Sequence, residues 1–281
     1  MTGTAGLAGR VALVTGGARG MGRTHAVALA QEGVDVALVD LCESFDSVPY
    51  PMATADDLAT TAQLVEDLGV RCRTFVADVR DLAAMVAVVA DVERDFGSVD
   101  VAIANAGVSS MGMIDEETAL NWSTVIDINL TGTFNVFRAA SPGMRRRHWG
   151  RLVGVSSMMG RTSNPTIAAY CASKWGVIGL VKAAAQDLAH HGVTVNAVAP
   201  GNIGTPMVLN EHMFKMMRPD LDAPTADDMA PVMAGLHAQP VPWLEPEEVT
   251  RAVMYLVADG AAHITGTVMD VSAGASARFT A

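Results

Sequence analysis

The stretch that decides the fold is Val11–Asp40, which reads VALVTGGARGMGRTHAVALAQEGVDVALVD. Both of its ends, VALV and VALVD, are apolar runs of strand length, and the residues between them have helical spacing. Gly16, Gly20 and Gly22 follow the first run at a G-x-x-x-G-x-G spacing, which allows a tight turn and lets a phosphate approach the backbone. The stretch therefore predicts a strand, a glycine turn, a helix and a second, parallel strand.

The same alternation of strand and helix continues along the chain. Further strands are expected at 72–77, 99–104, 152–155, 193–198 and 267–271, and helices at 55–68, 81–95, 118–146, 168–190 and 246–258. Because several strand runs are apolar without alternation, they suit a sheet buried on both faces. The pattern predicts an α/β fold, a single doubly wound domain over residues 1–281 with a parallel sheet.

Two segments interrupt this alternation. One is an insertion at 42–54, directly after the second strand, and the other is a longer segment at 205–243. Loops of this length are uncommon in compact domains and are often functional. We expect the second segment to be a helical lid over a substrate.

The composition excludes several classes of protein. The 281 residues are 50% hydrophobic and 17% charged, with a formal net charge of −11, too apolar for a disordered chain and too acidic for a nucleic-acid partner. No apolar run approaches the roughly 20 residues that a membrane-spanning helix needs. The first ten residues lack the apolar core of a signal peptide, so we expect a cytoplasmic protein. No metal-ligand spacing is present, and no catalytic metal is expected.

A carboxylate at the end of the second strand bears on the choice of cofactor. Asp40 can bond both ribose hydroxyls of an adenine dinucleotide and repel a 2′-phosphate, which favours NAD over NADP. Arg19 and Arg23 could instead attract that phosphate, so NADP stays open as an alternative. Asp40 could also be a plain turn residue, although the glycine turn before it argues against this.

Polar residues near the later strands are candidates for the chemistry. Tyr170 and Lys174 are four residues apart, on one face of the expected helix 168–190. A tyrosine has an ordinary pKa of about 10, and an adjacent ammonium would lower that pKa toward neutrality. Ser157 could donate to a substrate oxygen that gains negative charge, with Ser156 as its rival. Alone, the Tyr-x-x-x-Lys pair would more often be an ordinary exposed helical pair.

In their order, these motifs resemble the short-chain dehydrogenase/reductase family over nearly the whole chain. The matching motifs are Thr15-Gly16-x-x-x-Gly20-x-Gly22, Asp78-Val79, Asn105-Ala106-Gly107, Asn129, Ser157, Tyr170-x-x-x-Lys174, Asn196 and Pro200-Gly201. The resemblance implies a Rossmann-type domain that uses NAD. It implies Tyr170 as the acid–base group, Lys174 on the nicotinamide ribose and Ser157 on the substrate oxygen. Asn129 would hold a water in a proton relay.

The resemblance also implies which residues bind the cofactor. Thr205 would bond the nicotinamide carboxamide. The full expected set is Gly16, Arg19, Gly20, Met21, Gly22, Asp40, Leu41, Asp78, Val79, Asn105, Ala106, Gly107, Tyr170, Lys174, Pro200, Gly201, Ile203, Thr205 and Met207.

A narrower resemblance lies in the two interrupting segments. Tyr50–Thr54 in the insertion, and Met217–Leu221 and Pro240–Trp243 in the lid, are similar to the carveol dehydrogenase-like, mycofactocin-associated subgroup. That similarity implies oxidation of secondary alcohols such as terpenols. It also implies a tightly held NAD, reoxidised in place by mycofactocin, with the insertion over the adenine end. The lid methionines either line a pocket for an apolar alcohol or pack as core.

The helices expected at 118–146 and 168–190 predict an oligomer. The second is apolar around most of its circumference, and such a helix is normally buried. The family resemblance implies that this helix pair makes the main dimer contact within a homotetramer. Two other functions stay open: a dehydrogenase of a steroid or acyl-chain substrate with exchangeable NAD, and a non-catalytic NAD-binding sensor. The intact set of catalytic residues argues against the sensor.

Overall fold

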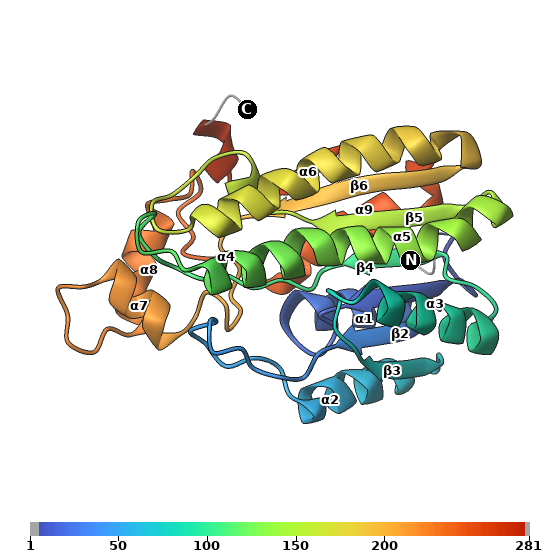
Figure 1. The fold of residues 1–281 in the computed structure, drawn as a ribbon, viewed down its shortest axis with the longest axis horizontal. Coiled ribbons are helices and arrows are strands. Elements are labelled where there is room, and N and C mark those ends of the chain that lie inside the picture. Colours follow the sequence, from blue (N-terminus) through green and yellow to red (C-terminus); the bar gives the residue numbers. More distant parts are fainter. Residues whose placement is uncertain (1–5, 279–281) are drawn as a thin grey trace.

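The computed structural model describes residues 6–278, which form a seven-stranded parallel sheet (Figure 1). The strands are β1 Val11–Thr15, β2 Asp35–Asp40, β3 Cys72–Val76, β4 Val101–Ala104, β5 Gly150–Val155, β6 Val193–Pro200 and β7 Val268–Val271. Their spatial order is β3-β2-β1-β4-β5-β6-β7. The order reverses between β1 and β4, and at such a switch point a doubly wound sheet binds ligands beyond its carboxyl edge. The predicted fold class is confirmed.

Helices cover both faces of this sheet. One layer holds α1 Gly20–Gln31, α2 Ala55–Glu66 and α9 Pro246–Val257. The other holds α3 Leu82–Phe96, α4 Ala119–Ile126, α5 Gly132–Arg147 and α6 Ala168–Leu188. None of the helices within the described residues is long and apolar enough to cross a membrane.

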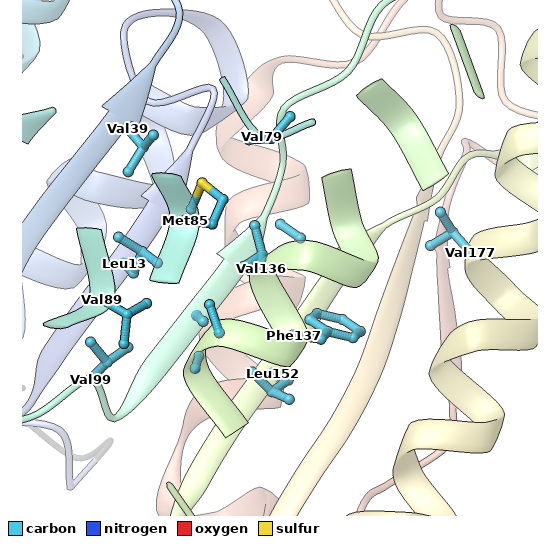
Figure 2. Packing of buried hydrophobic residues seen from close by; sticks show 14 of the residues in the cluster. Leu13, Val39, Val79, Met85, Val89, Val99, Val136, Phe137, Leu152 and Val177 are labelled. Atoms are coloured by element: carbon cyan, nitrogen blue, oxygen red, sulfur yellow. The ribbon is translucent and has the colours of Figure 1, made fainter. Parts of the chain in front are cut away.

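Alternate residues of β1 face the two layers. Leu13 packs in the cluster that holds Met85 of α3 and Phe137 of α5 (Figure 2). Val14 packs on the opposite face, in the cluster with Leu29 and Leu256. All residues of β1 are buried, which explains why this strand has an unbroken apolar sequence.

The single helix expected at 118–146 is divided in two, which corrects the sequence prediction. A π-helical turn at Asp127–Thr131 separates α4 from α5, and the Gly132 N–H donates to the Asp127 carbonyl. Such turns are frequent at functional sites. Apolar periodicity did not reveal this one because helical residues continue on both sides of it. Asn129 lies inside the turn and is completely buried.

The two interrupting segments lie at one end of the sheet, with the lid helices α7 Glu211–Met217 and α8 Ala226–Ala234 (Figure 1). The lid is helical as expected, and its two ends meet: Ile203 bridges Leu244, and the Gly204 N–H donates to the Leu244 carbonyl at 2.9 Å. The insertion, which we call the strap (residues 42–54), contains no helix or strand. Both segments therefore overhang the carboxyl edge.

Candidate active site

β1 brings the glycine turn to the carboxyl edge of the sheet. Gly16 and Gly20 have φ values of +62° and +55°, which favour glycine. A Cβ atom at Gly22 would lie 2.0 Å from the Gly16 carbonyl oxygen, so the turn has no room for a side chain there. Arg19 precedes α1 without a capping side-chain bond, so the first N–H groups of this helix are available to an anion.

The Asp40 carboxylate faces this turn from the end of β2. Its Oδ2 accepts from the Ala18 N–H at 3.1 Å, and its Oδ1 accepts from the Cys42 N–H at 3.3 Å. Asp40 also lines the hollow described below, where its negative charge would repel a 2′-phosphate. The carboxylate position therefore fits NAD.

The two arginines that could have attracted a 2′-phosphate are engaged elsewhere. The Arg23 guanidinium donates to the Ala18 carbonyl at 2.7 Å and to the Thr61 hydroxyl at 2.8 Å. The Arg19 guanidinium donates to the Pro51 carbonyl in the strap. Both guanidinium groups thus already have protein acceptors, which weakens the NADP alternative.

A hollow runs along the carboxyl edge from the glycine turn to the start of the lid. Many expected cofactor residues line it: Gly16, Arg19, Gly20, Met21, Asp40, Leu41, Asp78, Val79, Asn105, Ala106, Gly107, Thr205 and Met207. The other expected residues do not: Gly22, Pro200, Gly201, Ile203, Tyr170 and Lys174. Of these, Pro200 ends β6, and Tyr170 and Lys174 lie on α6.

The turn after β4 is tied to the glycine turn by hydrogen bonds. The Asn105 side-chain amide donates to the Thr15 and Gly16 carbonyls at 3.0 and 3.1 Å. The Thr15 hydroxyl accepts from the N–H groups of Asn105 and Ala106, both at 3.2 Å. These bonds explain why both motifs border one hollow.

Lys174 and Tyr170 of α6 lie together beside this hollow. The Lys174 Nζ donates to the Val155 carbonyl at 2.9 Å and is 5.5 Å from the centre of the Tyr170 ring. Burial lowers the pKa of Lys174 to about 8. Burial also raises the pKa of Tyr170, whereas a hydrogen bond with Ser157 lowers it. A Cβ atom at Gly107, which lines the hollow, would lie 3.4 Å from the Lys174 Nζ, so the buried ammonium lies directly behind this glycine.

The two serines after β5 have different partners. The Ser156 hydroxyl donates to the Lys174 carbonyl at 2.9 Å and so ties β5 to α6. Ser157 bonds Tyr170, and its Oγ accepts from the Met159 N–H at 3.1 Å. This geometry favours Ser157 over Ser156 as the serine at the reacting end.

The Asn129 side chain forms hydrogen bonds with other groups of the protein. Its Oδ1 accepts from the Val108 N–H at 2.8 Å. Its Nδ2 donates to the Val108 carbonyl at 2.9 Å and to the Ser173 hydroxyl at 3.0 Å, which uses both amide hydrogens. Its main-chain carbonyl accepts from the Thr133 hydroxyl at 2.7 Å. The expected role of Asn129 in holding a relay water stays a prediction.

The sequence left open whether the lid methionines line a pocket or pack as core, and the structure shows examples of both positions. Met229 and Met233 of α8 are buried, which makes them core of the lid itself. Met207 lines the hollow. Among residues 6–278, no group of three or more His, Cys, Asp or Glu side chains could hold a metal ion.

The chain belongs to the short-chain dehydrogenase family, whose model matches residues 10–214. It is 40% identical over 268 residues to (−)-trans-carveol dehydrogenase of Rhodococcus erythropolis, covering 95% of this chain and 97% of that one. The structure of carveol dehydrogenase from Mycobacterium avium in complex with NAD is similar at a TM-score of 0.95 and 40% identity, covering 97% of this chain and 99% of the other. A short-chain dehydrogenase from Mycobacterium paratuberculosis bound to NAD has a TM-score of 0.87 and 34% identity, over 96% and 99% of the chains.

These similarities confirm the predicted family and its carveol dehydrogenase-like character. They also confirm an NAD-dependent oxidoreductase, in agreement with the Asp40 carboxylate and the close glycine turn. The individual residue roles and the mycofactocin association stay predictions.

Sequence reasoning did not include the strap's own side chains in the site. Phe45, Tyr50, Met52 and Ala53 line the hollow. The strap was expected over the adenine end, yet the Tyr50 hydroxyl accepts from the Ser109 N–H at 3.1 Å, beyond the turn after β4. The sequence did offer one indication: apolar and aromatic residues in a loop are normally buried, so these side chains could have been expected to pack against the site.

Proposed function

We propose that this protein interconverts a secondary alcohol and its ketone with NAD, using Tyr170 as the acid–base group. The observation that carries the proposal is the grouping of Ser157, Tyr170 and Lys174 beside a hollow that fits a dinucleotide. The 40% identity to (−)-trans-carveol dehydrogenase supports the reaction class.

The residues that would hold NAD follow the length of the hollow. Asp40 would bond the adenine ribose, and the N-terminus of α1 would face the pyrophosphate. Lys174 would bond the nicotinamide ribose. Thr205 would bond the carboxamide; a Cβ atom at Gly20 would lie 3.3 Å from its Cγ2, so it faces the glycine turn. Bound NAD supplies the hydride acceptor of the reaction.

Proton transfer is the task of the protein's own side chains. As the alcohol is oxidised, the Tyr170 phenolate takes the hydroxyl proton, while the hydride leaves the carbinol carbon. Burial leaves the pKa of Tyr170 raised, and the Ser157 hydrogen bond acts against this by lowering it. A Lys174 ammonium beside the ring would also favour the phenolate. Ser157 would also hold the substrate oxygen. Lys174 and a water near Asn129 would return the proton to solvent.

We infer an apolar substrate of terpenol type, such as carveol. The 40% identity to (−)-trans-carveol dehydrogenase supports this class. The lid, which begins next to the hollow, contributes Met207 and Pro206, and methionine suits an irregular hydrocarbon shape. A steroid or acyl-chain alcohol remains the alternative substrate.

We propose further that NAD is held too tightly to exchange and is reoxidised in place by mycofactocin. Strap residues line the hollow, and the strap is attached to the glycine turn through Arg19 with Pro51 and to the loop after β4 through Tyr50 with Ser109. We also propose a homotetramer, in which helices α4, α5 and α6 form the main contact. Leu120, Phe134 and Trp175 of these helices are exposed in the single chain.

The purified protein provides the test of this function. Denaturation should release about one NAD per chain, and the native protein should oxidise apolar secondary alcohols with a dye acceptor but turn over poorly with added NAD. Exchangeable NAD together with a steroid or acyl-chain preference would favour the alternative enzyme. Binding of NAD without redox activity on a broad alcohol panel would favour the sensor.

A further inference from the structure

The strap is attached to the protein at points that lie far apart in the sequence. The Arg19 guanidinium donates to the Pro51 carbonyl, beside the glycine turn. The Ser47 hydroxyl donates to the Thr124 hydroxyl of α4 at 3.3 Å. The Arg80 guanidinium lies 4.8 Å from the centre of the Phe45 ring. The strap is therefore held in one position along the wall of the hollow.

Tyr50 gives the strap a further attachment, to the loop that follows β4. This β4 loop (residues 105–118) begins at the cofactor turn and leads to α4. Tyr50 is 8% exposed, and its Oη accepts from the Ser109 N–H at 3.1 Å. Ser109 and Ser110 are themselves buried. This bond joins the strap, which lines the cofactor hollow, to the loop beside the reacting end.

The β4 loop is in turn joined to the segment that precedes the catalytic helix. The Gly112 N–H donates to the Thr166 carbonyl at 2.8 Å, four residues before Tyr170. Burial raises the pKa of Tyr50, and Tyr170 raises it further through its charge, so the two phenols are close enough to interact. The Tyr50 hydroxyl therefore stays neutral near pH 7 and keeps its bond to Ser109.

We infer that Tyr50 is a positioning residue, which orders the β4 loop for the substrate when the strap covers the cofactor. The inference rests on the proposed function and deepens it. One hydroxyl then links cofactor retention to substrate binding. Because such coupling is reciprocal, a bound alcohol should slow the loss of NAD in the natural protein, and less so without the Tyr50 hydroxyl.

The test compares Tyr50→Phe, which keeps the ring and removes the hydroxyl, with Ser47→Ala, which removes another strap hydroxyl that bonds α4. For Tyr50→Phe we expect the KM for the alcohol to rise about 2- to 10-fold, the effect of one hydrogen bond, while kcat changes less. NAD release should be faster by a similar factor. Ser47→Ala should leave KM unchanged. An unchanged KM and NAD release in Tyr50→Phe, or an equal rise of KM in Ser47→Ala, would overturn the inference.

Hydrogen–deuterium exchange on the natural protein tests the same bond without any variant. Peptides that span residues 106–113 should be protected in the NAD-loaded protein and exchange faster after NAD is removed. Equal exchange in both forms would contradict the inference. These two readouts, NAD release and exchange, do not need turnover. If no alcohol is oxidised, the proposed function fails while the role of Tyr50 in holding the β4 loop is still decided.

Discussion

The Lys174 Nζ lies 5.5 Å from the centre of the Tyr170 ring, and its hydrogen bond to the Val155 carbonyl fixes it there. Burial acts on the two groups in the same sense, because it disfavours the charged form of each: it raises the pKa of Tyr170 and lowers the pKa of Lys174 to about 8. A Lys174 ammonium would stabilise the Tyr170 phenolate when the tyrosine gives up its proton.

Replacement of Tyr170 by Phe removes the proton acceptor and keeps the ring. We expect turnover of the alcohol to fall by about 100- to 10,000-fold, the usual range for loss of an acid–base group. NAD should still be found after denaturation of the purified variant, because the hollow is lined by other residues. The measurement is dye-linked alcohol oxidation, with cofactor content as the control for folding. Retained turnover would show that Tyr170 is not the acid–base group.

The buried Lys174 should lower the free energy of unfolding of the NAD-free protein near pH 7. The pKa of Lys174 in the folded protein is about 8, below its ordinary value of 10.5. Between pH 8 and pH 10.5 the unfolded chain therefore binds more protons than the folded one. The contribution of Lys174 to the free energy of unfolding therefore rises with pH through this window, and below it the buried charge is destabilising. For Lys174→Met we expect a free energy of unfolding about 1–3 kcal/mol higher at pH 7, with turnover lost.

Urea unfolding of NAD-free protein at pH 7 and pH 9.5 measures this effect. The advantage of the Lys174→Met variant should be smaller at the higher pH, since the natural protein then loses its buried charge. Lys182→Met is a suitable control, because Lys182 lies on the same helix and is exposed. A less stable Lys174→Met variant at pH 7 would contradict the prediction.

Asp40 should decide the choice between NAD and NADP. In Asp40→Ser the charge that repels a 2′-phosphate is removed, while a hydroxyl can still accept from the Ala18 N–H. We expect the ratio of NADP to NAD affinity to rise at least tenfold, about 1.4 kcal/mol. Binding to protein freed of its cofactor is the measurement. Asp46→Ser, a change at an exposed strap carboxylate, serves as the matched control and should leave the ratio unchanged.

The parts of this molecule that could be predicted from the sequence are those set by local patterns. Because β1 is buried on both faces, its sequence is an unbroken apolar run that predicts a strand. The glycine turn and Asp40 directly follow or end such strand runs, so their places at the carboxyl edge could be predicted as well. The Tyr50–Ser109 bond joins residues 59 positions apart, through a loop without periodicity. The π turn around Asn129 changes hydrogen bonding without changing residue types. Neither leaves a repeating signal in the sequence.

His25 should make the fold sensitive to acid. It is completely buried in α1, its Nδ1 lies 2.7 Å from the Thr250 hydroxyl, and burial lowers its pKa to about 3. Between the ordinary pKa of 6.5 and this lowered value, the unfolded chain binds the proton and the folded chain does not. The contribution of His25 to the free energy of unfolding is therefore fully present above about pH 6.5 and falls with pH, by about 1.4 kcal/mol per unit.

Replacement of this side chain by one that does not titrate should remove that slope. For His25→Gln we expect lower stability at pH 7, because the packing and the Thr250 bond are altered, but a weaker fall in stability between pH 6.5 and pH 4.5 than in the natural protein. His190→Gln, at an exposed turn after α6, should keep the original slope. Urea unfolding across this pH range is the measurement. Parallel stability curves for the natural protein and His25→Gln would mean that His25 gains its proton in the folded state, by opening the contact between α1 and α9.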